Sequence, residues 1–368
     1  MKHFIANSVG LSSELLRPVK DLKTTPPWLP SGRSIIVPCA RNALYLGYKA
    51  LGLPKNSAVL LPGFTCDTVS APLEKAGARL FLFNMFRDGS IDWDHVKSLL
   101  GKNVKALLAY HYLGVPHRFE EAVSFCKEHR LLLIEDCAHA LFSQRKGRAV
   151  GSAGDIAVFS IRKTIPANYA AALVINNRKI RLPHYSPNSV FSEPHLDHLA
   201  DTENYHHRLF LQSLDTGREV SRETFMERLH YMDRFYSNPA KLYPMDALSL
   251  QVMQNADPEA IREKRRRNYS IYLRHLKEIT FFKKLPEGAS PLAFPFYVER
   301  GRDVLKKRLE DAGIEPARYW PRHLLPEGAY KKFADTAWLA DHTLSLPCHQ
   351  DLHSSDIESV CESVKKLY

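Results

Sequence analysis

The chain has 368 residues, of which 45% are hydrophobic and 25% are charged. These fractions are typical of a folded globular protein and exclude a disordered or fibrous chain. The formal net charge of +11 at neutral pH raises the question of a nucleic-acid or other anionic partner. Two domains are expected, because one domain usually holds about 100 to 200 residues.

Neither a membrane anchor nor a metal site is expected from the sequence. No stretch approaches the roughly 18 uncharged apolar residues of a membrane-spanning helix, and the first residues lack the apolar core of a secretory signal. The six cysteines are scattered without a C-x-x-C pair, and no histidine cluster completes a zinc site. We therefore expect a reducing, cytoplasmic location, with no bound metal and no membrane partner.

Short apolar runs alternate with helical patterns from about residue 33 to residue 175. The runs predict strands over residues 58–61, 80–83, 105–110, 131–134, 156–160 and 171–175. Between them, apolar residues at helical spacing predict helices over residues 42–51, 68–76, 93–100 and 119–128. This alternation favours an α/β fold with a mainly parallel central sheet and helices on both faces.

The rest of the chain departs from this alternation. Residues 178–240 are rich in histidine, aspartate, tyrosine and proline, which we interpret as an excursion over the active-site face or a subunit contact. Long helices are predicted over residues 257–278 and 356–367. The chain is accordingly divided into an N-terminal arm, a large α/β domain and a smaller α+β domain, over residues 1–32, 33–240 and 241–368.

Polar residues that follow the predicted strands are the first candidates for a site, because ligands of open α/β sheets bind beyond the carboxyl ends of the strands. Asp136 ends one strand and Lys163 closely follows another. A buried acid can pair with a cationic ring nitrogen, and a partly neutral lysine amine can form a Schiff base. The ordinary alternatives are a helix N-cap for Asp136 and a surface position for Lys163.

Other polar residues fit an anionic ligand at the same edge. Ser160 and the start of the first helix, with Arg41, offer a hydroxyl, N–H groups and a cation for a phosphate. His139 is expected on the same helical face as Asp136, and His111 follows another strand. Capping and structural roles are the alternatives. Since neither G-x-G-x-x-G nor a Walker sequence follows a strand, dinucleotide and nucleoside triphosphate sites are poorly supported.

Several segments occur in an order that resembles one family. They are HYLGVP at 111–116, IEDCAHA at 134–140, K-G-R-x-V-G-x-x-G-D at 146–155, the pair Phe159-Ser160 followed by Lys163, and LSLPCHQDL at 344–352. Together they resemble the DegT/DnrJ-type sugar aminotransferases. These are pyridoxal-phosphate enzymes of fold type I, which is similar to aspartate aminotransferase. The likeness covers residues 33–175 and 243–368.

The resemblance implies a role for each candidate. Lys163 would form the internal aldimine with pyridoxal phosphate and then move a proton, while Asp136 would pair with the pyridinium nitrogen. His139 would lie near the phenolic oxygen of the cofactor, and Ser160 would contact its phosphate. The cofactor would also meet the helix start and two further side chains, at Ala40, Arg41, Asn42, Cys66 and His111.

The reaction implied by the resemblance is an amino-group transfer. An amino acid, expected to be glutamate, would donate the amine, and a keto-sugar linked to a nucleotide would accept it. In the C-terminal part, aromatic and basic side chains can stack on a base and bind a diphosphate, or can pack the domain interface instead; these are Arg318, Tyr319, Trp320 and His323. The fold also implies a homodimer.

Some features depart from the family pattern. Only Ile161 and Arg162 separate Ser160 from Lys163, fewer residues than is common, and residues 167–171 replace a glycine-rich stretch. A different reaction on the same fold, or a catalytically inactive scaffold or regulatory protein, therefore stays as the alternative function. The retained lysine argues against the dehydratase branch.

A nucleic-acid partner is not expected despite the positive charge. The strongest basic run, residues 262–267, lies on a predicted amphipathic helix. We expect its basic face to be solvated or at a subunit contact.

Overall fold

A computed structural model describes most of the chain. The described residues are 5–7, 9–10, 12–20, 23, 25–30, 33–116, 118–167, 169–185, 238–242, 245, 247–320, 324–325 and 331–368. Most of the predicted excursion over 178–240 lies outside them, so its expected role stays a prediction.

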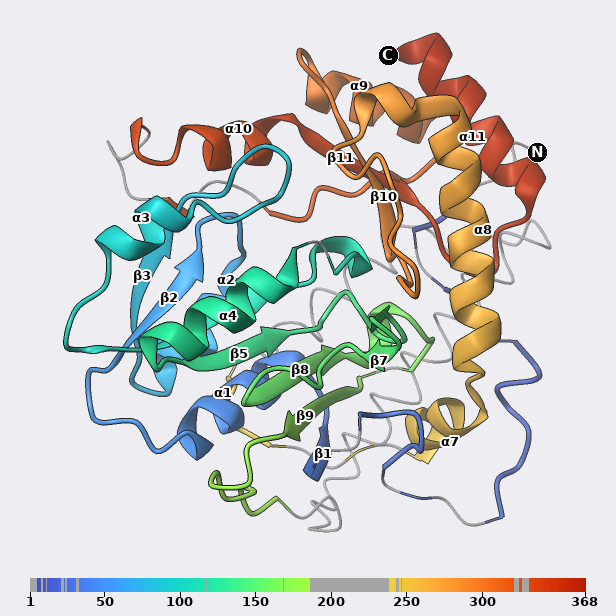
Figure 1. Ribbon diagram of the computed structural model, residues 1–368. Coiled ribbons are helices and arrows are strands. Elements are labelled where there is room, and N and C mark those ends of the chain that lie inside the picture. The colour runs from blue at the N-terminus through green and yellow to red at the C-terminus, as the bar shows by residue number, and fades with distance from the viewer. Residues whose placement is uncertain are drawn as a thin grey trace.

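A seven-stranded sheet forms the centre of this structure (Figure 1). In spatial order its strands are β1 (Arg33–Val37), β9 (Ala171–Ile175), β8 (Ile156–Ser160), β5 (Leu132–Asp136), β4 (Val104–Tyr110), β2 (Ala58–Pro62) and β3 (Arg79–Phe83). The pairs from β8 to β3 are parallel, whereas β9 is antiparallel to both of its neighbours. The mainly parallel sheet expected from the sequence is thus confirmed, with β1 as an additional edge strand.

Helices cover both faces of the sheet, as expected. One apolar cluster joins the strands to α1 (Ala40–Ala50) and α2 (Asp67–Lys75). A second cluster, built from the alternate side chains of the same strands, includes α4 (Phe119–His129). The short helix α3 (Trp93–Ser98) follows β3. Because strand side chains alternate between faces, apolar runs such as Ala58–Leu61 can enter both clusters.

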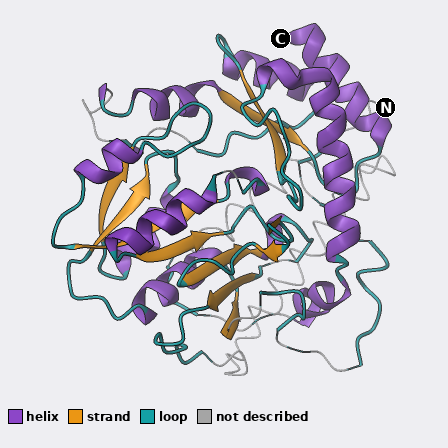
Figure 2. Ribbon diagram, viewed as in Figure 1, coloured by secondary structure: helices purple, strands orange, loops and turns teal. Residues whose placement is uncertain are grey.

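The C-terminal part builds a second, smaller layer of helices and strands (Figure 2). Its strands β10 (Ala293–Tyr297) and β11 (Thr343–Pro347) pair antiparallel. Its helices are α7 (Ala247–Asn255), α8 (Pro258–Leu276), α9 (Arg302–Asp311), α10 (Ala334–His342) and α11 (Ser354–Leu367). The apolar cluster on the α4 face continues without a break into this part, through Phe294 and Tyr272. The N-terminal arm also docks here, where Ile5 pairs with Ile314.

The basic run on α8 differs from its expected exposure. Arg262 and Arg265 are buried, at 9% and 1% exposure. The half-buried Arg266 donates to the carbonyls of Pro286 and Ala289. The prediction of a solvated basic face is therefore wrong for these three arginines, whose guanidinium groups bind acceptors within the chain, whereas Lys264 and Arg267 of the same run are exposed as expected.

None of the described helices has both the length and the apolar character needed to cross a membrane.

Candidate active site

Asp136 and Lys163 meet at the carboxyl edge of the sheet. Strands β5 and β8 are parallel neighbours, so both chains leave the sheet on the same side. Asp136 is the last residue of β5, and Lys163 lies in the short 3-10 turn Ile161–Lys163 directly after β8. The positive charge of Lys163 acts on the Asp136 carboxyl. The sheet topology therefore brings together the two residues that the sequence singled out most strongly.

His139 completes this group through a turn rather than a helix. The backbone after β5 folds back, with the Ala140 N–H donating to the Cys137 carbonyl, so the expected helical face is wrong. The imidazole nonetheless reaches the lysine, with 2.7 Å between His139 Nε2 and Lys163 Nζ. Burial and the Lys163 charge hold the pKa of His139 well below its usual value. The ring is therefore neutral, and its Nε2 can accept a hydrogen bond from the amine.

The Asp136 carboxyl is fully buried in this group. Burial raises its pKa to about 6, although the Ala138 N–H and the Lys163 charge act in the opposite direction. The hydrogen bond from Ala138 N to Asp136 Oδ1 is 2.9 Å long. A carboxylate that is destabilised by burial gains from a neighbouring cation. A protonated ring nitrogen can provide that charge.

Tyr110, which was not among the residues predicted from the sequence, borders the site, and so does Cys66, which was. Tyr110 lies opposite Asp136 in the β4–β5 register, so the two side chains share one side of the sheet. Its hydroxyl hydrogen-bonds the hydroxyl of Thr65. Cys66 begins α2 and interacts electrostatically with both Lys163 and Asp136, as expected for a residue near the cofactor. Tyr110 is the last residue of the strand predicted over 105–110, so taking the final strand residues as candidates, as was done for Asp136, could have identified it.

His111 is a correction to the expected site. Because it follows Tyr110 directly, its side chain takes the other side of the strand. There its Nε2 lies 2.9 Å from Glu135 Oε1, and its ring stacks on Phe119 with the centroids 4.1 Å apart. This buried pairing explains why His111 does not join Lys163, Asp136 and His139.

The two segments predicted to hold a phosphate, the start of α1 and Ser160, both lie at the carboxyl edge of the sheet. Helix α1 begins at Ala40, and the side chain of its N-cap residue Cys39 does not cap the backbone N–H groups of the first turn. The Asn42 side chain is buried and donates to the carbonyls of Pro239 and Lys241, so at Asn42 it is the backbone N–H group that can bind a ligand. Ser160 is buried at the end of β8. Contact of Ala40, Arg41, Asn42 and Ser160 with a phosphate stays a prediction.

The predicted substrate residues divide into two groups. The Tyr319 ring meets His139 edge-on at 5.0 Å, and Trp320 lies 5.2 Å from the same imidazole. Trp320 is only 5% exposed, which favours its alternative role in packing the interface. Arg318 pairs instead with Asp303 of α9 at 3.7 Å, so its predicted diphosphate contact has no support here. His323 lies outside the described residues.

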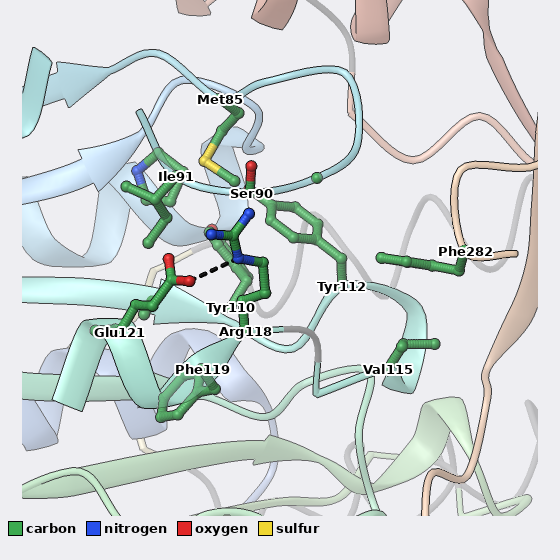
Figure 3. A pocket seen from close by; sticks show the side chains of 14 residues that line it. Met85, Ser90, Ile91, Tyr110, Tyr112, Val115, Arg118, Phe119, Glu121 and Phe282 are labelled. Carbon is green, nitrogen blue, oxygen red and sulfur yellow. Dashed lines mark hydrogen bonds and ion pairs between the residues drawn. The ribbon is translucent and has the colours of Figure 1, made fainter. Parts of the chain in front are cut away.

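An apolar pocket opens beside this site, at the carboxyl ends of β2 and β4 (Figure 3). Tyr110 and Tyr112 are among the residues that line it, and the ion pair between Arg118 and Glu121 lies close to the Tyr112 ring (Figure 3). Phe282 lines it from the C-terminal part. The pocket therefore lies between the sheet and the C-terminal part, and none of the site residues predicted from the sequence lines it.

These residues fit pyridoxal phosphate. A buried carboxyl, a lysine amine and a neutral imidazole converge, and His139 Nδ1 is buried without a hydrogen-bond partner. Asp136 would bind the ring nitrogen, and Lys163 would hold the cofactor covalently. His139 would lie against the ring and its substituents. The start of α1 and Ser160 would hold the phosphate.

The fold and this donor set define a pyridoxal-phosphate-dependent aminotransferase of fold type I. A model of the DegT/DnrJ/EryC1/StrS aminotransferase family matches residues 30–181 and 194–365. The chain belongs to this family.

Individual relatives agree with this assignment. A UDP-4-amino-4,6-dideoxy-N-acetyl-beta-L-altrosamine transaminase of Campylobacter jejuni is 27% identical, and the match covers 89% of this chain and 85% of the relative. A GDP-perosamine synthase of Escherichia coli O157:H7 is 24% identical, over 89% of this chain and 83% of the relative. The fold is similar to Helicobacter pylori PseC, an aminotransferase, with a TM-score of 0.70, 15% identity and coverage of 100% and 99% of the two chains.

Proposed function

We propose that this protein transfers an amino group from an amino acid, with glutamate as the expected donor, to a keto-sugar linked to a nucleotide. The relatives from Campylobacter jejuni and Escherichia coli are named for nucleotide-linked amino sugars and match along most of their length. The observation that carries the chemistry is the 2.7 Å contact between Lys163 and His139 beside the buried Asp136.

Each residue of the site has a distinct part in the proposed reaction. Bound pyridoxal phosphate supplies an electron sink for the negative charge that develops at the carbon losing its proton. Lys163 would hold the cofactor covalently, and its amine would carry the proton. His139 accepts a hydrogen bond from that amine and orients it, while Asp136 keeps the ring nitrogen protonated. Tyr319 lies against His139, where it can contact the sugar.

The first test concerns the attachment of the cofactor. The purified protein should be yellow with pyridoxal phosphate, and borohydride should fix the cofactor to the peptide that contains Lys163. We expect Lys163→Ala to abolish this labelling and the transfer activity. Lys97→Ala is the matched control, because Lys97 is an exposed lysine on α3 that pairs with Asp94. Covalent labelling that persists in Lys163→Ala would contradict the assignment.

The second test concerns the two substrates. Glutamate alone should bleach the yellow form and release 2-oxoglutarate in an amount equal to the cofactor. A keto-sugar nucleotide should then restore the colour, whereas the free keto-sugar should do so far more slowly. Equal rates with and without the nucleotide would refute the proposed substrate class. A protein that releases no 2-oxo acid from glutamate or from any other amino acid would favour the alternative of a regulatory scaffold.

We also propose that the protein is a cytoplasmic homodimer with a separate small domain over residues 241–368. All six cysteines are free thiols, which suits a reducing compartment. Sedimentation equilibrium should give twice the chain mass of 42.0 kDa. A monomer at micromolar concentration would contradict the dimer.

A further inference from the structure

The turn that carries Lys163 is held on one side by the adjacent strand. The N–H groups of Ile161 and Arg162 both donate to the carbonyl of Ala170, at 2.8 and 3.2 Å. The Arg162 guanidinium also lies over the Tyr169 ring. The residues after the lysine that replace the glycine-rich stretch of the family therefore contact the turn directly.

On the other side, the carbonyl of Thr164, the residue after Lys163, is bound by two side chains from the C-terminal part. Gln350 Nε2 donates to it at 3.0 Å, and Arg265 Nη2 donates at 3.4 Å. The two side chains also bind each other, through Arg265 Nε and Gln350 Oε1 at 2.8 Å. Thr164, Arg265 and Gln350 are all buried. Three segments far apart in the sequence thus meet at one backbone oxygen.

Arg265 is unusual in what it binds. It is 1% exposed, yet it takes no part in the ion pairs found among the described residues. Its remaining donors bind the carbonyls of Pro291 and Leu292, at 3.1 and 3.3 Å. A buried guanidinium without a carboxylate loses hydration that Coulomb attraction does not restore. Its planar fork does, however, fix several neutral acceptors in one geometry.

We propose that Arg265 and Gln350 form a clamp on the Thr164 carbonyl that positions Lys163. The clamp rests on the function proposed above, since Lys163 is the residue whose position matters. The amine at the end of the long Lys163 side chain must contact both His139 and the cofactor. A displacement of a reacting group by about 1 Å can lower a reaction rate about a hundredfold. Arg265 and Gln350 are therefore positioning residues: they act on Lys163 through the backbone.

The clamp gives the C-terminal part a direct effect on the site. Gln350 follows β11 within the segment LSLPCHQDL, and Arg265 lies on α8. Helix α8 and the segment after β11 must therefore both be packed in place before the Thr164 carbonyl is bound. Any movement of the C-terminal part relative to the sheet would therefore be transmitted to the Lys163 turn.

The decisive variant is Gln350→Glu. The new carboxylate keeps the acceptor for Arg265 Nε and gives that cation a counter-ion, but it loses the donor to Thr164 and repels its carbonyl. We expect the melting temperature to stay within a few degrees of the wild type. Amide hydrogen exchange of residues 161–167 should become about tenfold faster, because one buried hydrogen bond is lost. The fraction of chain fixed to pyridoxal phosphate by borohydride at limiting cofactor should fall.

Matched variants separate this effect from general loosening. Arg266→Lys, one residue along α8, removes hydrogen bonds to Pro286 and Ala289 and should change neither measurement at the Lys163 turn. Gln350→Met repeats the test without the added charge. The exchange measurement is made on the full chain with and without pyridoxal phosphate, so it does not depend on activity.

The outcomes distinguish the clamp from the proposed function. Unchanged exchange of residues 161–167 in both folded Gln350 variants would overturn the clamp, even if Lys163 is the labelled residue. Faster exchange together with a lower fixed fraction would support it. If exchange quickens but borohydride fixes the cofactor to a different lysine, the role of Lys163 is refuted and its positioning by the clamp falls with it.

Discussion

At the scale of single residues, Asp136 shows a conflict between stability and binding. Its carboxyl is fully buried, and burial raises its pKa from 3.8 to about 6. The folded chain thus holds the proton more tightly than the unfolded chain does. The carboxyl lowers stability above pH 6, where it is ionised in both states, and this penalty disappears below about pH 4, where it is protonated in both. A cation bound beside it would remove the conflict.

Asp136→Asn should therefore stabilise the cofactor-free protein. We expect the free energy of unfolding to rise by up to about 3 kcal/mol near pH 8, since each pKa unit corresponds to about 1.4 kcal/mol. The gain should fade as the pH falls to about 4, and the variant should lose its affinity for pyridoxal phosphate. Urea denaturation across this pH range measures the first effect, and cofactor titration measures the second.

Asp94→Asn is the control for this prediction, because its side chain is 98% exposed. It should change neither quantity. A stability difference between Asp136→Asn and the wild type that does not vary with pH would refute the explanation by burial.

At the scale of elements, the end of β5 has a different function on each side. Glu135 faces away from Asp136 and accepts hydrogen bonds from His111 Nε2 and from the N–H groups of a loop, those of Gly151, Ala153 and Gly154. Burial alone would raise the pKa of Glu135, but His111 and the loop N–H groups hold it below its usual value. The carboxylate thereby ties the loop before β8 to the end of β5, and so fixes the two strands that carry Asp136 and Lys163.

Glu135→Gln should destabilise the protein by about 3 kcal/mol at neutral pH. The amide keeps one acceptor oxygen and turns an NH₂ group toward donors, which leaves buried groups unpaired. Because the folded pKa is lowered, the carboxylate contributes stability above the unfolded pKa near 4.3, and this contribution is lost as the pH falls through the folded value. The gap between variant and wild type should therefore narrow in acid.

Chemical denaturation at neutral pH and near pH 3.5 measures this prediction. Glu128→Gln is the control, since the Glu128 side chain is 75% exposed. An equal loss at both pH values would indicate altered packing instead of a lost charge.

At the scale of the whole molecule, the backbone at Gly114 and His139 packs closely against the backbone at Ser290 in the C-terminal part. We call this contact the seam. Gly114 has a φ of +82°, and a Cβ there would lie 2.8 Å from the carbonyl oxygen of His139 and would also strike that of Ser290. The Ser143 hydroxyl donates to the Gly114 carbonyl at 2.7 Å and accepts from Ser290 N at 2.9 Å. The seam thus brings the C-terminal part against the backbone of His139.

Gly114→Ala should destabilise the protein by forcing the backbone segments of this seam apart. Gly52→Ala is a matched control, because Gly52 also has a positive φ, of 61°, but has no atoms within 4 Å of its added Cβ. We expect Gly52→Ala to cost about 1 kcal/mol from backbone strain alone, and Gly114→Ala to cost at least about 3 kcal/mol. Denaturation curves measure both. Equal losses would show that crowding at the seam is unimportant.

The predicted elements agree with the structure where the pattern was purely local. The helices begin and end within a few residues of their expected bounds, because apolar spacing reflects the face that each one buries. The edge strand Arg33–Val37 was not predicted, since it gains its strand partner β9 only from far along the chain. The turn at His139 was predicted as helical because the hydrogen bonds that shape it include one to the neighbouring strand β8, which the local sequence pattern does not indicate.

The sequence by itself determined the class of enzyme, through its resemblance to one family, and it singled out Asp136 and Lys163 as candidate site residues. Asp136 and Lys163 follow apolar runs, and the carboxyl ends of parallel strands lie at the same edge of a sheet, where ligands bind. Only the tertiary structure decided which neighbours join them. The strand register turned Tyr110 toward Asp136 and His111 toward Glu135. From the sequence, Arg265 is expected to be a surface charge. Its acceptors are backbone carbonyls and an amide that segments far along the chain supply, and the local sequence pattern does not indicate them.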